Sequence, residues 1–319
     1  MPLSLWKFRP SALTSAVNAF TSGFSRYELT GCYESDNQRA IRDGVEILPM
    51  GAQSKLRTLQ WNINSGWHNS RVHSGAAVQR GIIDAIRRAD ADVVVLNEYC
   101  SGRFTRLESC EEDLKALGYS SVTCAGVDYP TVIATRLRVT ERKEVRLSFD
   151  RSALLVRVES NDGTLVWVIG THLNHENGKR RHEEMQNLLR ELDLMSLLGG
   201  AGAGERTLLV GDLNQQHECD YARDEWVRIR SGMEDRDSCQ DDGVAKLLGD
   251  NGFVCAWDQD ATPPAFRTNW DTSRPPATHW SGTIVDYSYG SPGISPVTVS
   301  ISPSGWSDHR MTVCDWTWQ

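Results

Sequence analysis

Short polar side chains stand at five points of the chain where a hydrophobic run ends. The blocks are Trp61-Asn62-Ile63-Asn64, Leu96-Asn97-Glu98, Thr171-His172-Leu173-Asn174, Gly211-Asp212-Leu213-Asn214 and Ser307-Asp308-His309. If the hydrophobic runs are strands, they deliver these side chains to one edge of a sheet. Carboxylates, imidazoles and amides gathered there supply oxygen ligands for a hard metal ion, a base and groups that stabilise charge. Metal-assisted cleavage of a phosphate ester needs this set.

Two blocks show most clearly how strands would position these groups. Glu98 follows the apolar residues 93–96, so it should emerge at the C-terminal edge of a strand. The period of two along an extended chain places Asp212 and Asn214 on one side and Leu213 on the other. A surface carboxylate or an ordinary turn is the alternative for each block. The abrupt end of the apolar run at Asp212 favours a shared site.

From about residue 55 to its end, the sequence resembles the endonuclease/exonuclease/phosphatase superfamily. Motif residues occur in the order of that superfamily: Asn62, Glu98, His172, Asp212, Asn214, Asp286, Asp308 and His309. A single Gly-Asp-x-Asn or Ser-Asp-His arises easily by chance, whereas six blocks in order are a specific signal. Two positions depart from the pattern, because Asn97 stands where Gln is common and Asn64 where many of the nucleases carry an acidic residue.

The resemblance implies a metal site and a water site. Asn62, Glu98 and Asp308 would form the site of Mg²⁺, with Mn²⁺ as an alternative. Asp212 and Asn214 would act on the attacking water and on a phosphate oxygen. Zinc is disfavoured at this centre, because the sequence has no His-Glu-x-x-His motif and oxygen ligands dominate the blocks. The reaction would be an in-line displacement by water.

The resemblance also assigns roles to the histidines. His172 and His309 would balance charge on the phosphoryl oxygens. Asp286 would accept a hydrogen bond from one ring nitrogen of His309, which fixes the tautomer and favours the charged ring. Asn174, two residues after His172, is expected to bind substrate. Whether His309 acts mainly as a base or as a charge stabiliser stays open.

Composition narrows the class of protein. The chain has 319 residues, of which 39% are hydrophobic and 24% charged, values that are ordinary for a soluble globular protein. None of its apolar runs approaches the length of a membrane span, so we expect no integral membrane segment. The formal net charge of −8 argues against a protein that coats nucleic acid by bulk attraction, but it is compatible with a nuclease. Eight cysteines without Cys-x-x-Cys spacing favour reduced thiols in an intracellular protein, with disulfides as the alternative.

Three local patterns have a plain structural interpretation. The basic segments 136–151 and 179–182 both have acidic residues nearby. Each segment could form a solvated face with local ion pairs, or it could bind the phosphates of a substrate. The glycine-rich run 199–204 follows a predicted helix and precedes a predicted strand. A phosphate-binding loop has the opposite order, so a flexible connector is favoured.

We expect the chain to divide into an N-terminal extension at 1–54, which lacks the motifs, and the phosphoesterase domain that the resemblance implies at 55–319. The first 27 residues contain no acidic side chain, as in organelle transit segments, whereas Pro10 and the lack of a clear amphipathic helix favour a disordered or packing extension. Within the domain we expect helices at 78–86, 176–198 and 242–250. Strands are expected at 56–61, 93–96, 130–135, 153–158, 164–170, 207–211, 282–289, 297–301 and 311–316.

Several of these strands follow one another without an intervening helix, which disfavours a doubly wound parallel sheet. The resemblance implies an α+β fold of two mixed β-sheets packed face to face with helices on the outside, a four-layer α/β sandwich. It also implies Mg²⁺-dependent hydrolysis of phosphodiester bonds, with nucleic acid as the expected substrate of an endo- or exonuclease. A phospholipid or an inositol phosphate is the alternative. A catalytically silent scaffold would have lost a motif residue, and all are present.

A proline-rich stretch before Asp286 bears on the substrate. Residues 257–286 contain two Pro-Pro pairs, which predict a loop with extended, stiff segments near the catalytic edge. Trp270 and Trp280 lie on this loop. They could cap the core, or they could form a substrate-binding wall on which a nucleobase stacks.

Overall fold

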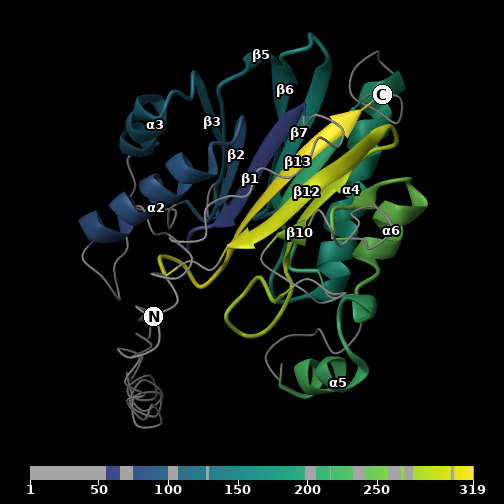
Figure 1. Cartoon of the computed structure of the whole chain (residues 1–319). Helices are drawn as coiled ribbons and strands as arrows, with labels where there is room; N and C mark the ends of the chain where they lie inside the picture. Colours follow the sequence, from purple (N-terminus) through teal and green to yellow (C-terminus); the bar gives the residue numbers. More distant parts are fainter. Residues whose placement is uncertain are drawn as a thin grey trace, which may run out of the picture. The chain divides into compact units, whose positions relative to one another are not determined.

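The computed structural model describes residues 55–64, 75–99, 107–126, 129–197, 206–215, 217–232, 241–257, 267–268, 276–302 and 305–318. The expected N-terminal extension at 1–54, the glycine-rich run 199–204 and Trp270 lie outside this part of the chain. Figure 1 shows the order of the elements along the chain.

The first sheet is mixed and, within the described residues, has seven strands in the order β10-β12-β13-β1-β2-β4-β3. Its central strand β1 pairs parallel with β2 and antiparallel with β13. The C-terminal ends of β1 and β2 therefore share an edge with the N-terminal end of β13. The strands are β1 (Leu56–Asn62), β2 (Val93–Asn97), β3 (Ser121–Ala125), β4 (Thr131–Thr135), β10 (Arg267–Thr268), β12 (Ile294–Ser302) and β13 (Met311–Trp318).

The second sheet, also mixed, has six strands in the described residues, in the order β5-β6-β7-β8-β11-β9. Parallel pairing of β7 with β8 sets His172 beside Asp212, and antiparallel pairing of β8 with β11 sets Asp212 beside Asp286. Three motif residues thus meet at one edge. The strands are β5 (Arg138–Arg146), β6 (Ser152–Glu159), β7 (Leu165–His172), β8 (Thr207–Asp212), β9 (Val254–Cys255) and β11 (Asp286–Gly290).

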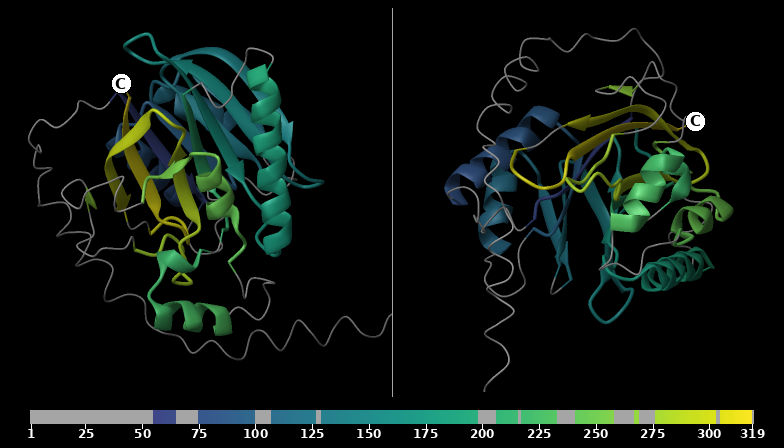
Figure 2. Two further views of the ribbon diagram at one scale, coloured as in Figure 1. Left: turned by 90° about the vertical axis from the view of Figure 1, so that its right-hand side faces the viewer. Right: turned by 90° about the horizontal axis from the view of Figure 1, so that it is seen from below.

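Helices cover the outer faces of the two sheets. In Figures 1 and 2, α2 and α3 lie on the first sheet, and α4 and α6 lie beside the second. This arrangement is the expected four-layer α/β sandwich of two mixed sheets. The helices are α2 (Gly75–Ala89), α3 (Leu107–Ala116), α4 (Gly178–Leu197), α5 (Arg223–Gly232) and α6 (Val244–Asp250), with a 3-10 turn η1 at Glu218–Asp220. Among the described helices, none is both long and apolar enough to cross a membrane.

Strand β2 shows how alternate residues serve both layers of the core. Val93 and Val95 belong to the core that contains residues of both sheets. Val94 and Leu96 belong to a second core with Ile82 of α2. Because successive side chains of a strand point to opposite faces, the apolar run 93–96 must be covered on both sides. The two-sided burial explains why this run has no polar residue.

The structure corrects the strand expected at 282–289, which begins only at Asp286. Side chains take the backbone donors that a neighbouring strand would otherwise satisfy. Ile284 donates to the hydroxyl of Tyr221, and Val285 donates to Oγ1 of Thr278. These bonds satisfy the backbone donors ahead of the strand, and regular pairing with β8 begins where Asp286 stands opposite Asp212.

The basic segment 136–151 contains the edge strand β5. Its side chains form local ion pairs, Arg138 with Glu159 and Lys143 with Glu191. Charged residues on an edge strand discourage pairing with other chains. This position supports the solvated-face interpretation. The described cysteines, Cys110, Cys124, Cys219, Cys255 and Cys314, form no disulfide with one another.

Gly211 allows β7 and β8 to approach closely, and we expect Gly211→Ala to destabilise the protein. A Cβ at this position would overlap the carbonyl oxygen of Thr171. Forcing an extra methyl group into a packed site costs about 1 to 3 kcal/mol. The melting temperature should therefore fall. Gly249→Ala is the matched control, since a Cβ there meets no atom within 4 Å. Equal melting temperatures for the two variants would contradict the prediction.

Candidate active site

The strand ends of both sheets surround a pocket of about 180 Å³. Glu98 follows β2, His172 and Asp212 end β7 and β8, and His309 precedes β13. The pocket thus forms at the edge where the sequence places its polar blocks. Its lining residues are Asn64, Glu98, Tyr129, His172, His175, Asp212, Asn214, His279, Val285, Asp308 and His309.

Three of the residues that line the pocket have a left-handed backbone conformation. Asn64, Glu98 and Asn214 have φ values of 45°, 47° and 47°. Such a conformation costs roughly 1 to 2 kcal/mol for a residue with a Cβ. Asp212 and Asn214 therefore share the pocket through a turn, in which the amide of Asn214 donates to Oδ1 of Asp212 at 3.0 Å. The expected alternation along an extended segment is replaced by this turn, although Leu213 is buried as expected.

Asn62 connects one carboxylate from each sheet. Its Nδ2 donates to Oε1 of Glu98 at 3.0 Å and to Oδ2 of Asp212 at 2.9 Å. Its Oδ1 accepts from the backbone of Asn64 at 3.0 Å. Asn62 is fully buried and lies behind the pocket wall. Of the three residues expected to hold the ion, Glu98 and Asp308 line the pocket, whereas Asn62 orients two carboxylates from below.

A buried polar network lies under the pocket and joins the two sheets. Gln60 Nε2 donates to Oδ1 of Asp286 at 2.7 Å. Asn97 Oδ1 accepts from the backbone of Asp212 at 3.0 Å, and its Nδ2 donates to the carbonyl oxygen of Thr171 at 3.0 Å. Neither Gln60 nor Asn97 was expected to support the site. The signal was available, because a polar residue inside an otherwise buried strand must find a partner.

His309 is held by Asp286 and faces two further carboxylates. Its Nδ1 donates to Oδ2 of Asp286 at 2.9 Å. Its Nε2 lies 3.8 Å from Oδ2 of Asp212 and 4.0 Å from Oδ1 of Asp308. Burial disfavours the charged ring, but the carboxylates of Asp286, Asp212 and Asp308 outweigh burial and raise the pKa of His309 to about 10. The ring is a cation aimed at the pocket.

His172 and Asp212 are buried groups whose pKa values move in opposite directions. His172 Nε2 lies 3.6 Å from Oδ2 of Asp212 and 3.8 Å from Oε1 of Glu98. Burial, followed by the charge of Arg151, lowers the pKa of His172 well below its usual value. Burial, followed by the charge of Asp286, raises the pKa of Asp212 to about 7. The site therefore combines a neutral imidazole with a carboxyl group that can take up a proton near neutral pH.

The segment before β11 attaches to the site through backbone hydrogen bonds. His279 and His309 form an isolated β-bridge, and Trp280 donates to the carbonyl oxygen of Asp308 at 2.9 Å. The side chain of Trp280 is 75% exposed, so it does not belong to the core. Its ring lies 5.7 Å from the ring of His279, which lines the pocket. Trp280 thus stands at the rim of the pocket.

Tyr129 lines the pocket on another side. Its ring packs edge-on against His172 at 5.7 Å, and the guanidinium of Arg151 lies 4.2 Å from the ring centroid. Neither Tyr129 nor His279 was among the residues expected at the site. Tyr129 precedes the apolar run of β4, whereas the polar blocks of the sequence stand where apolar runs end. His279 lies in the proline-rich stretch, which carries no motif.

Asn174 is not brought into the pocket. It is buried, and its Oδ1 accepts from the backbone amides of Glu176 and Asn177 at 3.1 and 2.8 Å. These bonds shape the turn that leads into α4. The spacing of His172 and Asn174 equals that of Asp212 and Asn214. Asn214 nevertheless lines the pocket, whereas Asn174 stabilises a turn.

The model of the Endonuclease/Exonuclease/phosphatase family matches residues 59–309. The chain belongs to this family. Membership identifies the protein as a phosphoesterase, a hydrolase of phosphoester bonds. Among curated protein sequences, none matches the chain.

Solved structures of this family share the fold. The human nocturnin catalytic domain with bound sulfate has a TM-score of 0.60 and 19% identity, covering 83% of this chain and 94% of that chain. TDP2 of D. rerio, complexed with single-strand DNA product, has a TM-score of 0.56 and 16% identity, covering 83% and 100%. The mannosyl-6-phosphatase of Bacteroides thetaiotaomicron has a TM-score of 0.58 and 16% identity, covering 82% and 100%. At these identities the likeness shows the fold alone.

Members of the endonuclease/exonuclease/phosphatase family generally use a divalent metal ion. The pocket suits a cation, because Glu98, Asp212 and Asp308 place three carboxylates on its wall and no lysine or arginine is among its described lining residues. Three groups of described residues could hold an ion: Glu98 with His172 and Asp212, Asp212 with Asp286 and His309, and His279 with Asp308 and His309. The first two have two carboxylates each, the ligands that Mg²⁺ prefers, and both carboxylates of the first line the pocket.

Proposed function

We propose that this family member hydrolyses phosphodiester bonds in nucleic acid with Mg²⁺, or Mn²⁺ in its place, as the metal. The observation that supports the proposal best is the pocket itself. Carboxylates from both sheets, Glu98 and Asp212, share one amide donor behind its wall, and the charged imidazole of His309 lies 3.8 Å from the Asp212 carboxylate. Positioned charges of this kind supply most of the catalysis in phosphoryl transfer.

We infer that Glu98 is the principal metal ligand and that Asp308 lies near the ion. Glu98 has a carboxylate side chain that is 23% exposed toward the pocket, and Asn62 fixes its orientation. A bound Mg²⁺ would polarise a phosphoryl oxygen of the substrate. Asn62 keeps the carboxylate in place without entering the pocket.

Asp212 and Asn214 are proposed to position the attacking water. Oδ1 of Asp212 is occupied by the backbone of Asn214, and Oδ2 faces the pocket beside Asn62. A carboxylate held by such bonds can orient a water and accept its proton. The side-chain amide of Asn214 donates one N–H to the carbonyl oxygen of Leu173 at 3.2 Å, so its second N–H can donate to a phosphate oxygen.

His309 and His172 are proposed to stabilise charge on the phosphoryl group. Asp286 holds Nδ1 of His309, so Nε2 is directed to the pocket. His172 ends β7, which pairs with β8 on the side away from β11. Its Nε2 lies 3.6 Å from the Asp212 carboxylate. Donors that are already in place stabilise a transition state without reorganising. All family motif residues are present, which argues against a silent scaffold.

The exposed ring of Trp280 supports nucleic acid as the substrate. Aromatic side chains at the rim of a phosphodiester site offer faces on which bases stack. Tyr129, which is 38% exposed, offers a second face in the pocket. Trp270 stays a sequence-based prediction, since it lies outside the described residues.

We expect Trp280→Ala to weaken hydrolysis of a single-stranded oligonucleotide much more than hydrolysis of bis-p-nitrophenyl phosphate. Stacking on one base is worth roughly 1 to 3 kcal/mol, and the small diester has no base to stack. The measurement is kcat/KM for both substrates in Mg²⁺. Phe149→Ala is the matched control, because Phe149 is 86% exposed and does not line the pocket.

Equal losses on both substrates would remove the evidence for base stacking. In that case sphingomyelin and inositol phosphates become the next substrates to assay. Inactivity of the wild-type protein on every phosphodiester would overturn the proposed function.

A further inference from the structure

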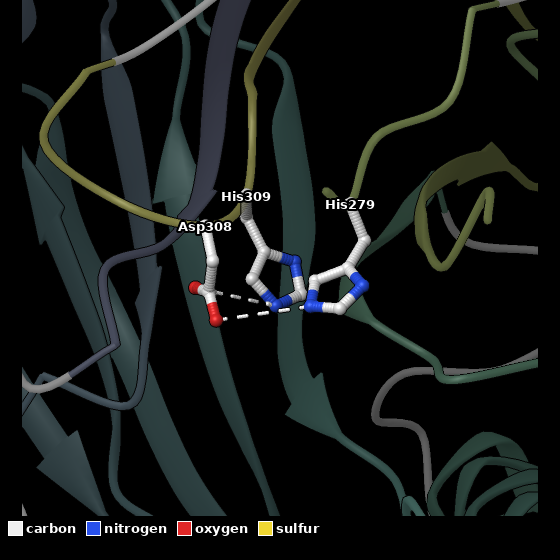
Figure 3. Close-up of side chains that lie close together, drawn as sticks. All are labelled: His279, Asp308 and His309. Atoms are coloured by element: carbon white, nitrogen blue, oxygen red, sulfur yellow. Dashed lines mark ion pairs between the residues drawn. The ribbon is translucent and has the colours of Figure 1, made fainter. Parts of the chain in front are cut away.

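We propose that His279, Asp308 and His309 bind a first-row transition-metal ion such as Zn²⁺, at a place that shares Asp308 with the surroundings of the magnesium site inferred around Glu98 but is centred on the two imidazoles. His279 is the residue that distinguishes the two places, because it belongs to no motif of the catalytic set. Figure 3 shows the three side chains together, with both rings presenting a nitrogen to the carboxylate.

The distances place three donor atoms around one point. Nε2 of His279 lies 3.7 Å from Oδ2 of Asp308, and Nε2 of His309 lies 4.0 Å from Oδ1 of the same carboxylate. The three donor atoms of the group lie within 4.8 Å of one another. Zinc binds such atoms at roughly 2.0 to 2.2 Å, so its ligands stand roughly 3 to 4 Å apart. Small side-chain rotations bring all three into contact with one ion.

Both imidazoles are held through their other nitrogen. Nδ1 of His309 donates to Asp286 at 2.9 Å. Nδ1 of His279 is hydrogen-bonded to Oγ of Ser281 at 2.6 Å and also lies 3.3 Å from the backbone amide of Ser281, and the Ser281 hydroxyl is bonded to Oγ1 of Thr283 at 2.9 Å. Histidines that ligate metals almost always have such a partner on the far nitrogen, which fixes the ring. Binding of the ion would leave the hydrogen of His279 on Nδ1 and would release to solvent the proton that the charged His309 ring carries on Nε2.

The backbone brings the two rings together independently of a metal. His279 and His309 pair in an isolated bridge, and their ring centroids are 4.6 Å apart. The bridge is extended on both sides by Trp280, which donates to Asp308 O at 2.9 Å, and by Arg310, which donates to Thr278 O at 2.7 Å. The ligands are therefore positioned by main-chain hydrogen bonds rather than by a flexible loop.

The donor set selects the class of ion. Two imidazoles with one carboxylate suit zinc and its neighbours, whereas Mg²⁺ prefers oxygen ligands alone. Asp308 has a side chain that is 31% exposed, while those of His279 and His309 are 12% and 8% exposed. The open side at Asp308 leaves room for water to complete the coordination.

One consequence rests on the proposed function. If His309 contacts the phosphoryl group during hydrolysis, an ion on its Nε2 blocks that contact. Zn²⁺ should then inhibit the Mg²⁺-supported reaction, and the loss of His279 should raise the concentration of Zn²⁺ needed.

Metal binding is the direct test, and it needs no substrate. The full chain, freed of metal with EDTA and dialysed, is titrated with Co²⁺ by visible absorption and with Zn²⁺ by calorimetry. We expect one equivalent whose binding depends on His279, with Zn²⁺ displacing Co²⁺. His279→Asn should weaken affinity by at least the roughly 10- to 100-fold typical of lost support to a ligand. Ser281→Ala, which keeps all three ligands, should fall between this variant and wild type.

His217→Asn is the matched control, because His217 pairs with Asp241 at 2.8 Å and does not line the pocket. Melting temperatures verify that each variant is folded. Wild-type affinity in both His279→Asn and Ser281→Ala overturns the proposal, as does binding that Glu98→Gln removes and His279→Asn leaves intact. Zinc binding that depends on His279, in a protein without hydrolytic activity, would sustain this site and refute the proposed function alone.

Discussion

Glu98→Gln is expected to abolish hydrolysis while the protein stays folded. The substitution removes the negative charge and keeps the shape of the side chain, including the oxygen that accepts from Asn62. A metal ion stabilises the transition state by several kcal/mol, so the loss should be on the order of a thousandfold or more in kcat. The measurement is hydrolysis in Mg²⁺, with circular dichroism and thermal melting to establish that the fold is retained.

Two controls belong with this experiment. Glu183→Gln removes a carboxylate from the exposed face of α4, where the side chain is 56% exposed, and should leave activity unchanged. Excess EDTA should inactivate the wild-type protein, and Mg²⁺ or Mn²⁺ should restore it. Full activity in EDTA, or in the Glu98→Gln variant, would exclude the proposed metal site.

His309→Ala and Asp286→Asn are expected to act as one unit, so that the double variant loses little more than the worse single variant. Asp286 is fully buried, does not line the pocket, and is hydrogen-bonded to Nδ1 of His309, which does. A positioned proton-transfer or charged group is worth about a hundred- to ten-thousandfold, and residues that share one role are strongly non-additive. The measurement is kcat/KM for wild type, both singles and the double variant.

The prediction would be contradicted if the loss of kcat/KM in the double variant equalled the product of the losses in the two single variants. That outcome would show that Asp286 contributes by a route other than His309, and its bond from Gln60 is the first candidate. Because Asp286 is buried, each variant must first show a melting curve close to that of the wild type.

Much of the fold follows from the sequence because its central strands are buried on both faces. The runs 93–96 and 208–210 consist of apolar residues and lie just before polar ones, so the sequence indicates where these strands lie and how long they are. Strand β5 was not expected, since its exposed residues carry charge and only pairing with β6 defines it. The short helices α3 and α5 were not expected either, because their apolar residues are few.

Part of the candidate site could also be predicted from the sequence. Glu98, His172, Asp212 and His309 stand at strand ends, and the sheets bring them together. The sequence did not show that Asn62 lies behind the wall, because its amide can face the pocket or the carboxylates from the same backbone position. Nor did it show His279, whose place depends on a backbone bridge to a residue thirty positions later.

The shared amide of Asn62 ties catalytic competence to the packing of the two sheets. Glu98 belongs to one sheet and Asp212 to the other, and one side chain spans them. A conformer in which the sheets slide apart, even with every strand intact, would separate the two carboxylates and be inert. Enzymatic activity should therefore report on the interface between the layers, and it should vanish in a molten globule that retains its secondary structure.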